Sequence, residues 1–223
     1  WRTDDESYSE SIGKAEAGKF GVPSRVESGN RQLILTGSHF YSCTFEDCTL
    51  PGTDFSDALL ELTKIKGTNK NSATLNGSSF EGAYLKYTDF INVNLSGTLM
   101  TKVRLENCDF ESSVLAGASL VEAELTGCTF GEDCNFNGTS FKNARLTGVN
   151  FNGANLTNAD LSGCTTRGLK GKVPLLPEDC QIKFDLKINR DTAGVATDTL
   201  TLGTYSIVVN AGRFSNGVRE KGN

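Results

Sequence analysis

The 223-residue chain is poor in several residue types on which site chemistry depends. It contains one His, one Trp and one Met, and a single His excludes most histidine-based metal sites and catalytic triads. No apolar run approaches the roughly 18 residues that a membrane-spanning helix needs. Lys and Arg number 22 against 27 Asp and Glu, and the resulting net charge of −5 argues against a basic nucleic-acid binder.

Catalytic and cofactor-binding motifs are also absent. The sequence has no phosphate-binding loop, no dinucleotide-binding glycine motif, no HExxH motif and no nucleophile elbow. His39 falls in an exposed slot, which is not a catalytic arrangement. Asp and Glu are plentiful, but without a concave pocket paired carboxylates indicate a solvated surface. The sequence therefore predicts no enzyme, no cofactor and no metal site.

What the sequence does contain is a period of five residues. From residue 33 onward it divides into blocks such as LILTG, SHFYS and TDFSD, and later VNFNG, ANLTN and ADLSG. The middle residue, here called the centre, is almost always Leu or Phe. Centres run from Leu35 to Phe130 in steps of five, and after one inserted residue, Asp133, they continue from Phe136 to Leu161.

A period of five fits neither a helix nor a flat strand. On a helix, five residues rotate by about 500°, so successive centres would scatter around the axis. On a flat strand, an odd period sends successive centres to opposite faces. The chain must therefore turn a corner about every five residues, with one large side chain inward on each side. More than half of the 24 Gly lie two residues after a centre, where a corner needs unusual dihedrals.

These blocks resemble the pentapeptide-repeat family, whose pattern is A-(D/N)-L-x-x. ANLTN and ADLSG match this pattern outright, and most other blocks are degenerate versions of it. The resemblance implies an all-β fold, a right-handed four-sided β-helix with about 20 residues per coil. We expect an N-terminal extension, cap or linker at 1–32, the β-helix at 33–168 and a β-rich C-terminal extension at 169–223.

The two ends of the chain differ from the repeat. Residues 6–19 favour a short helix, and residues 21–32 read as a linker into the first coil. Near the C-terminus, QIKFDLKIN alternates apolar and polar residues, and LTLGTYSIVVN follows beyond a polar loop. This pattern predicts a β-hairpin with one buried face. We expect the hairpin to cap the rod and to contact a partner.

With about 20 residues per coil, centres 20 apart should stack in columns. One column holds four Phe and predicts a continuous aromatic ladder. A Lys in the same column would be a costly buried charge. We therefore expect residues 66–72 to bulge outward and to leave this Lys in water. The members of the column are Leu50, Lys70, Phe90, Phe110, Phe130 and Phe151.

The cysteines follow the repeat as well. Six of the seven lie two residues before a centre, in a slot that elsewhere holds Ala, Ser, Thr or Val. There is no CxxC pair to suggest a metal site. Only Cys108 and Cys128 share a column in adjacent coils, and parallel Cβ vectors suit a disulfide poorly. We interpret them as structural thiols. Free thiols favour a reducing compartment such as the cytoplasm or plastid stroma, which is compatible with thylakoid association.

The outward positions supply the candidate protein-binding residues. On the face of the 40, 60 and 80 column, apolar residues interrupt a polar surface, which marks either a docking surface or ordinary scattered apolar residues. The next face is mildly basic and the one after it mildly acidic, which is typical of a solvated surface or of an electrostatically oriented partner. The apolar candidates are Tyr41, Leu59, Leu62, Leu99 and Val121. The basic candidates are Lys64, Lys86 and Arg104, with Tyr84 and Tyr87 on the same face, and the acidic face carries Asp89, Asp109, Glu111 and Glu132.

A rigid rod without a pocket offers surface and spacing rather than chemistry. The sequence therefore favours a non-catalytic scaffold, adaptor or structural subunit that binds other proteins within a larger complex, with nucleic acid not expected as a partner. The resemblance implies an association with photosynthetic assemblies, because the family is abundant in cyanobacteria and plastids. It also implies an alternative, a DNA-mimicking regulator of a topoisomerase such as gyrase. Against that alternative, residues 33–168 carry 15 acidic and 9 basic residues, a net charge of only −6.

Overall fold

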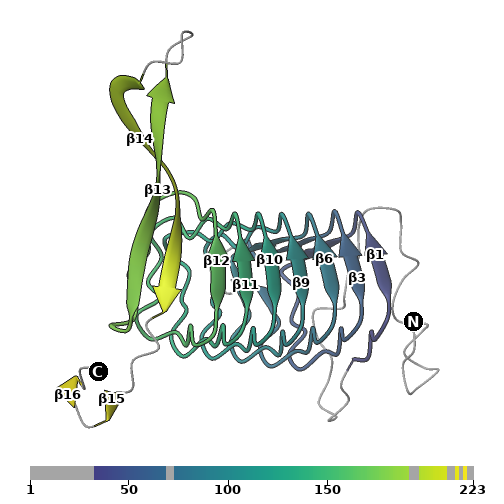
Figure 1. Cartoon of the computed structure of the whole chain (residues 1–223). Coiled ribbons are helices and arrows are strands. Elements are labelled where there is room, and N and C mark those ends of the chain that lie inside the picture. Colours follow the sequence, from purple (N-terminus) through teal and green to yellow (C-terminus); the bar gives the residue numbers. More distant parts are fainter. Residues whose placement is uncertain (1–32, 69–72, 191–195, 210–213, 216–217, 220–223) are drawn as a thin grey trace, which may run out of the picture.

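The computed structural model places a long rod and a protruding hairpin (Figure 1). The structure describes residues 33–68, 73–190, 196–209, 214–215 and 218–219, and for 186–190, 196–203 and the last two ranges it describes the backbone alone. The helix expected at 6–19 and the linker expected at 21–32 lie outside the described residues.

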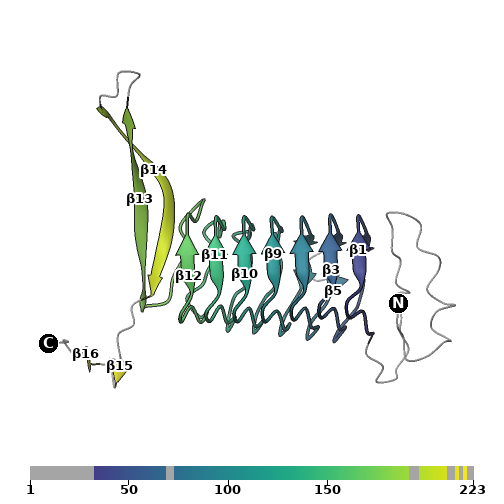
Figure 2. The same cartoon turned by 45° about the vertical axis from the view of Figure 1, so that its right-hand side comes forward.

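The rod is a four-sided parallel β-solenoid, and the expected all-β fold is confirmed (Figure 2). We number its sides in chain order. Side 1 is a seven-stranded parallel sheet in the order β1-β3-β6-β9-β10-β11-β12. Its strands are β1 (His39–Tyr41), β3 (Leu59–Glu61), β6 (Tyr84–Lys86), β9 (Arg104–Glu106), β10 (Glu124–Thr126), β11 (Arg145–Thr147) and β12 (Thr165–Arg167).

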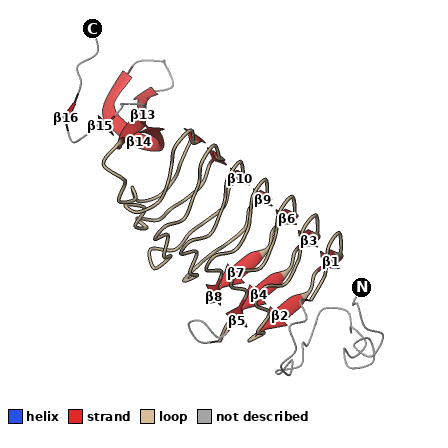
Figure 3. Ribbon diagram, turned by 90° about the horizontal axis from the view of Figure 1, so that it is seen from below, coloured by secondary structure: helices blue, strands red, loops and turns tan. Residues whose placement is uncertain are grey.

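The other three sides have shorter ladders (Figure 3). Side 2 contains β2 (Thr44–Glu46), β4 (Lys64–Lys66) and β7 (Asp89–Ile91), and side 3 contains β5 (Ala73–Thr74) and β8 (Val93–Asn94). Isolated parallel bridges extend both sides along the rod and form the whole of side 4, where Ser79 pairs with Leu99. Within the described residues there is no helix.

Two slots hold hydrogen-bonded polar residues in many blocks, although Ala or Val often fills the second. The Asp or Asn before a centre accepts a hydrogen bond from the amide two residues later, as from Asn137 N to Asn135 Oδ1 at 3.0 Å. This local bond fixes the start of the corner. A Thr, Ser or Cys two residues before a centre donates to the carbonyl of another centre, in the preceding coil for Thr88 Oγ1 to Leu60 O at 3.0 Å and in the same coil for Thr98 Oγ1 to Leu95 O at 2.8 Å. The repeat therefore satisfies its polar groups within each side and between coils.

Cys occupies this second slot as a donor as well as a small apolar side chain. Cys134 Sγ donates to Phe110 O at 2.8 Å, and Cys108 Sγ donates to Leu85 O at 3.4 Å. All seven Cys are free thiols. Burial raises the pKa of Cys134 to about 11, so this thiol stays protonated and unreactive at neutral pH.

The aromatic ladder of side 2 is confirmed from Phe90 onward. The rings of Phe90 and Phe110 stack with centroids 4.9 Å apart, and the same distance separates Phe110 from Phe130. Phe130 and Phe151 follow at 5.4 Å. The predicted first two members are wrong, because the backbone register places Phe45 and Ile65 below Phe90. Leu50 stacks instead toward Leu75 on side 3, as the hydrogen bond from Leu50 N to Thr74 O shows.

This difference arises because one coil is five residues longer than expected. Leu60 pairs with Leu85 and Ile65 with Phe90, whereas Leu85 pairs with Leu105. The five additional residues, 68–72 and here called the excursion, fall between Gly67 and Ala73 in the sequence. Among the described glycines that lie two residues after a centre, only Gly67, which directly precedes these residues, lacks the positive φ of a corner. The predicted bulge over 66–72 is wrong at its start, because Lys66 is the last residue of β4 and pairs with Glu46 and Ile91. Lys70, which was expected to stay in water, lies outside the described residues.

The excursion changes which residues share a side. Each residue after position 72 lies one side earlier than an unbroken period would place it. Residues near Leu85 and Leu105 therefore join side 1 with Phe40 and Leu60, while those near Met100 and Leu120 belong to side 4.

A hairpin closes the C-terminal end of the rod, as predicted. Strands β13 (Cys180–Arg190) and β14 (Ala196–Val209) are antiparallel. Leu169 and Tyr205 exchange backbone hydrogen bonds of 2.8 and 3.0 Å, and Tyr205 and Ile207 are buried against the last coil. The parallel bridges continue to Leu175, past the expected end of the repeat at 168. Near the end of the chain, β15 (Phe214–Ser215) pairs with β16 (Val218–Arg219).

The excursion can be tested by deletion. Removing residues 68–72 joins Gly67 to Ala73 and creates a coil of the ordinary length without moving any column. We expect this variant to fold cooperatively with an almost unchanged thermal midpoint, measured by circular dichroism. Deleting residues 113–117 also removes five residues, but it shifts every later centre by one side and should abolish cooperative unfolding. Equal damage from both deletions would contradict the register.

The ladder makes a second prediction. Replacing Phe110 with Ala removes a ring stacked on both faces and should lower the free energy of unfolding by about 3–5 kcal/mol. The matched change Tyr41→Ala, at a side chain that is 59% exposed, should cost about 0.5 kcal/mol or less. Denaturant titration measures both values, and an unchanged midpoint for Phe110→Ala would refute the stacked column.

Candidate protein-binding surface

The eight predicted binding residues do not share one face. Tyr41, Leu59, Lys86 and Arg104 lie on side 1, Leu62 lies at the corner between sides 1 and 2, and Lys64 lies on side 2. Leu99 and Val121 lie on side 4, so the predicted single apolar face is wrong. Tyr41, Leu62 and Leu99 are exposed, whereas Leu59 and Val121 are half-buried.

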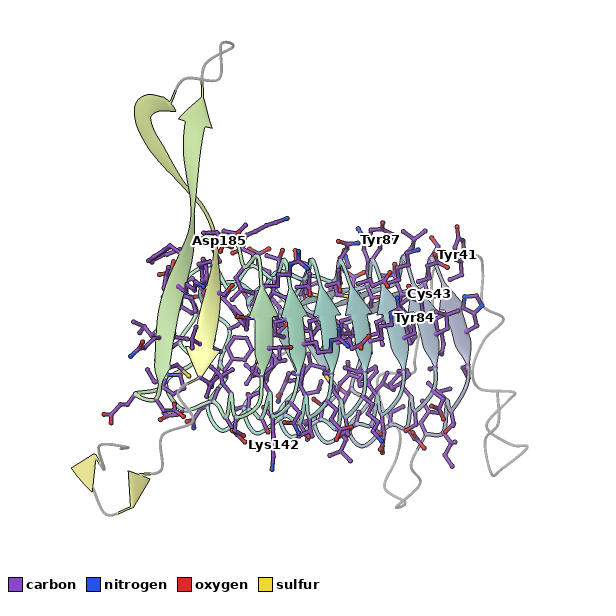
Figure 4. The ribbon with its side chains drawn as sticks, in the orientation of Figure 1. Tyr41, Cys43, Tyr84, Tyr87, Lys142 and Asp185 are labelled. Carbon is purple, nitrogen blue, oxygen red and sulfur yellow. The ribbon has the colours of Figure 1, made fainter. Side chains whose placement is uncertain are left out.

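The excursion instead brings two tyrosines to the N-terminal half of side 1. Tyr84 pairs directly with Leu59 across adjacent coils, and Tyr87 occupies the corner next to Leu62. Figure 4 shows Tyr41, Tyr84 and Tyr87 on the part of the rod nearer β1. We call this surface the aromatic patch, and it consists of Tyr41, Leu59, Leu62, Tyr84, Lys86, Tyr87 and Arg104.

A polar network holds the centre of the patch in place. The Tyr84 hydroxyl donates to Glu106 Oε2 at 2.7 Å, and Arg104 Nη2 lies 2.6 Å from Glu106 Oε1. The Arg104 guanidinium also lies 4.9 Å from the centroid of the Tyr84 ring. The phenol hydrogen bond lowers the pKa of Glu106 and raises the pKa of Tyr84, with Arg104 adding to the effect on Glu106.

Two corners of the patch carry bulky residues in an unfavourable conformation. Leu62 has a φ of 52° and Tyr87 a φ of 49°, a region that large side chains rarely adopt. Their side chains are 44% and 47% exposed. Lys86 Nζ lies 5.5 Å from the centroid of the Tyr87 ring. The following corners in the same row are occupied by Asn107 and Gly127, which suit this conformation. The fold itself therefore does not require Leu or Tyr here.

Charge is interleaved along the sides rather than separated between them. On side 1, Lys86 lies between Glu61 and Glu106 of the adjacent strands, and Arg145 pairs with Glu124 at 3.6 Å. On side 2, Lys64 is the register partner of Asp89. The predicted basic and acidic faces are therefore wrong, because the excursion shifts the later charges onto the other side.

The described residues show no sign of a bound group. Within them, no three His, Cys, Asp or Glu side chains gather as a metal site would require. Every buried side-chain nitrogen or oxygen among them has a hydrogen-bond partner. In the described part of the chain, no helix is long and apolar enough to cross a membrane.

The period of five, the corner geometry and the stacked centres agree with two family models. One, described as a pentapeptide repeat region, matches residues 103–172, and another, described as pentapeptide repeats in eight copies, matches residues 71–101. Residues 71–101 and 103–172 are therefore pentapeptide repeats. No curated protein sequence matches it.

Several solved structures of pentapeptide-repeat proteins resemble part of the chain. A trypsin-treated form of QnrB1, a plasmid-mediated fluoroquinolone resistance protein, is 14% identical over 66% of this chain and 91% of its own, with a TM-score of 0.43. A protein from the Arabidopsis thaliana thylakoid lumen is 24% identical over 56% and 74%, with a TM-score of 0.33. HetL, involved in heterocyst differentiation regulation in the cyanobacterium Nostoc, is 23% identical over 59% and 65%, with a TM-score of 0.26.

The hydrogen bonds around Glu106 should have a measurable effect on the pKa of its carboxyl group. Its pKa in the folded protein lies below the unfolded value, so the stabilisation is present above the unfolded pKa and is lost as the pH falls through the folded one. Tyr84→Phe removes the phenol donor and should raise the pKa of Glu106 toward its ordinary value. Tyr87→Phe should leave it unchanged. Carboxyl-carbon NMR titration measures both, and equal pKa values in wild type and Tyr84→Phe would contradict the network.

Proposed function

We propose that this pentapeptide-repeat protein is a non-catalytic scaffold that binds another protein through the aromatic patch. The observation that carries the proposal is the pair of exposed bulky residues, Leu62 and Tyr87, at left-handed corners. The left-handed φ recurs at other corners, including Lys102 and Glu122, and what distinguishes Leu62 and Tyr87 is that their side chains are large, largely apolar and exposed. A partner that contacts both side chains gives a reason for their presence.

The composition of the patch suits protein recognition. Tyr and Arg are the residues most enriched at the energetic centres of interfaces, where they supply large contact area with a polar tip. Tyr84 and Arg104 are already held in one arrangement through Glu106, so little conformational entropy would be lost on binding. The rod adds rigidity, because each coil is hydrogen-bonded to the next. These features support an adaptor or structural subunit of a larger complex.

Lys64, Leu99 and Val121 are left out of this proposed site. Lys64 faces side 2, and the other two face side 4, so a partner on the aromatic patch would not contact Leu99 or Val121. Leu99 and Val121 therefore serve as controls in the binding experiment.

The alternative of DNA mimicry has less support. A mimic of the duplex backbone needs a continuous acidic surface. Here basic residues interrupt the acidic ones on sides 1 and 2, as Lys86 and Lys64 do. A gyrase supercoiling assay tests this alternative directly, and inhibition at stoichiometric concentration would restore it.

Substitutions at the strained corners should change the free energy of unfolding and the affinity for a partner in opposite directions. Leu62→Gly and Tyr87→Gly remove strained side chains, so each should raise the free energy of unfolding by about 0.5–1 kcal/mol and also weaken partner binding. Lys102→Gly, at a corner with a φ of 58° outside the patch, should have the same stabilising effect and leave binding unchanged. Thermal unfolding measures the first effect.

Partner binding is measured by affinity capture from source cells with quantitative mass spectrometry. We expect wild type, Lys102→Gly and the double change of Leu99 and Val121 to Ser to recover the same stoichiometric partner. Leu62→Gly and Tyr87→Gly should lose it. Identical recovery by all variants would refute the patch as the binding surface.

A further inference from the structure

The outermost strand of the C-terminal hairpin has an unpaired edge. Strand β14 lies against β12 and the last coil, and β13 lies outside β14 (Figures 1 and 2). Among the residues that the structure describes, β13 pairs with β14 alone. An 11-residue edge strand with free amide and carbonyl groups is a ready template for another strand.

The hairpin is also incomplete as a sheet. Its lower part packs on the rod, but the paired strands extend beyond the rod's outline (Figure 2). A two-stranded ribbon is marginally stable in water, and a third strand is usually needed. Phe184 lies at the edge with 46% of its surface exposed, and it contacts only the ring of Tyr205 among described aromatic residues. A neighbouring strand would cover this ring.

We propose that β13 pairs antiparallel with β13 of a second copy of this chain, with Phe184 on the twofold axis. The result is a four-stranded sheet across the dimer in the order β14-β13-β13-β14. The residues involved lie outside the aromatic patch, so this proposal stands or fails independently of the proposed function.

The charges next to Phe184 favour a second copy of this chain as the source of the strand that pairs with β13. In an antiparallel pair centred on Phe184, Lys183 lies opposite Asp185 of the second copy, and the same contact recurs by symmetry. Both side chains are exposed, and no described acidic side chain lies within ion-pair distance of Lys183. Asp185 Oδ2 accepts a hydrogen bond from Thr204 Oγ1 of β14 at 2.8 Å, which fixes the position of the carboxylate. Opposite charges placed directly across strands stabilise pairing.

The apolar positions agree with the same register. Phe184 lies opposite its own copy, and Ile182 lies opposite position 186, which is a Leu. Aromatic and aliphatic cross-strand pairs of this kind stabilise sheets. A strand is therefore self-complementary in both charge and apolar character when it is centred on Phe184, and this symmetry is what an isologous interface requires.

The test is a charge swap on the full chain, read by light scattering after size exclusion across a dilution series. Wild type should be a dimer that dissociates on dilution. Lys183→Glu alone and Asp185→Lys alone each place like charges opposite one another twice, and each should weaken dimerisation by at least about tenfold. An equimolar mixture of the two variants restores both opposite-charge contacts and should recover the dimer as a heterodimer.

A control on the same strand fixes the register. Lys187→Glu changes the net charge as much as Lys183→Glu, but in this register position 187 lies opposite Gln181 and the dimer should persist. Circular dichroism confirms that each variant is folded. A monomeric wild type, a dimer that neither single swap weakens, a mixture that stays monomeric, or a dimer lost in Lys187→Glu instead of Lys183→Glu would overturn the proposal.

Discussion

The rod depends on one constraint, that equivalent positions of successive coils stack and share backbone hydrogen bonds. Phe90 N donates to Asp109 O at 2.6 Å, and Phe110 N donates to Thr129 O at 2.9 Å, in the same pattern one coil later. Stacking in register places large centres over large centres, which buries Phe110 between Phe90 and Phe130. It also brings the outward residues of separate coils into rows, so any surface on this protein is built from residues about 20 apart.

The sequence was sufficient for the fold and insufficient for the surface. The spacing of Leu and Phe predicted corners, columns and the aromatic ladder, because a large apolar residue at a centre indicates that this position is buried. The sides could not be assigned from spacing alone, since a complete five-residue block can leave the rod without disturbing the period. Lys70 is the residue in the sequence that indicates the longer coil, because burying a charged centre in an apolar column is costly. The expected bulge over 66–72 begins too early, since Lys66 belongs to β4, and the consequence of a longer coil for Tyr84, Leu99 and the charged faces was not predicted.

The aromatic patch contains corner residues that the fold accepts but does not require. Corners in the same row are held by Asn107 and Gly127, and the same backbone accepts Leu62 and Tyr87 only with strain. The C-terminal hairpin shows a similar departure, because its base caps the last coil through Leu169 and Tyr205 while its outer strand is left with an open edge. Both departures occur where the chain presents apolar surface, which is why both support binding roles.

The composition of side 1 depends on one coil, from Leu60 to Leu85, being five residues longer than the coil from Leu85 to Leu105. The most direct measurement is a set of inter-strand nuclear Overhauser effects from the backbone of Leu60 in isotopically labelled protein. We expect cross-peaks between the strand at Leu60 and the strand at Leu85, because these residues are register partners. Cross-peaks from Leu60 to the segment around Phe80 would contradict this pairing, because that register belongs to an unbroken period and would dismantle the aromatic patch.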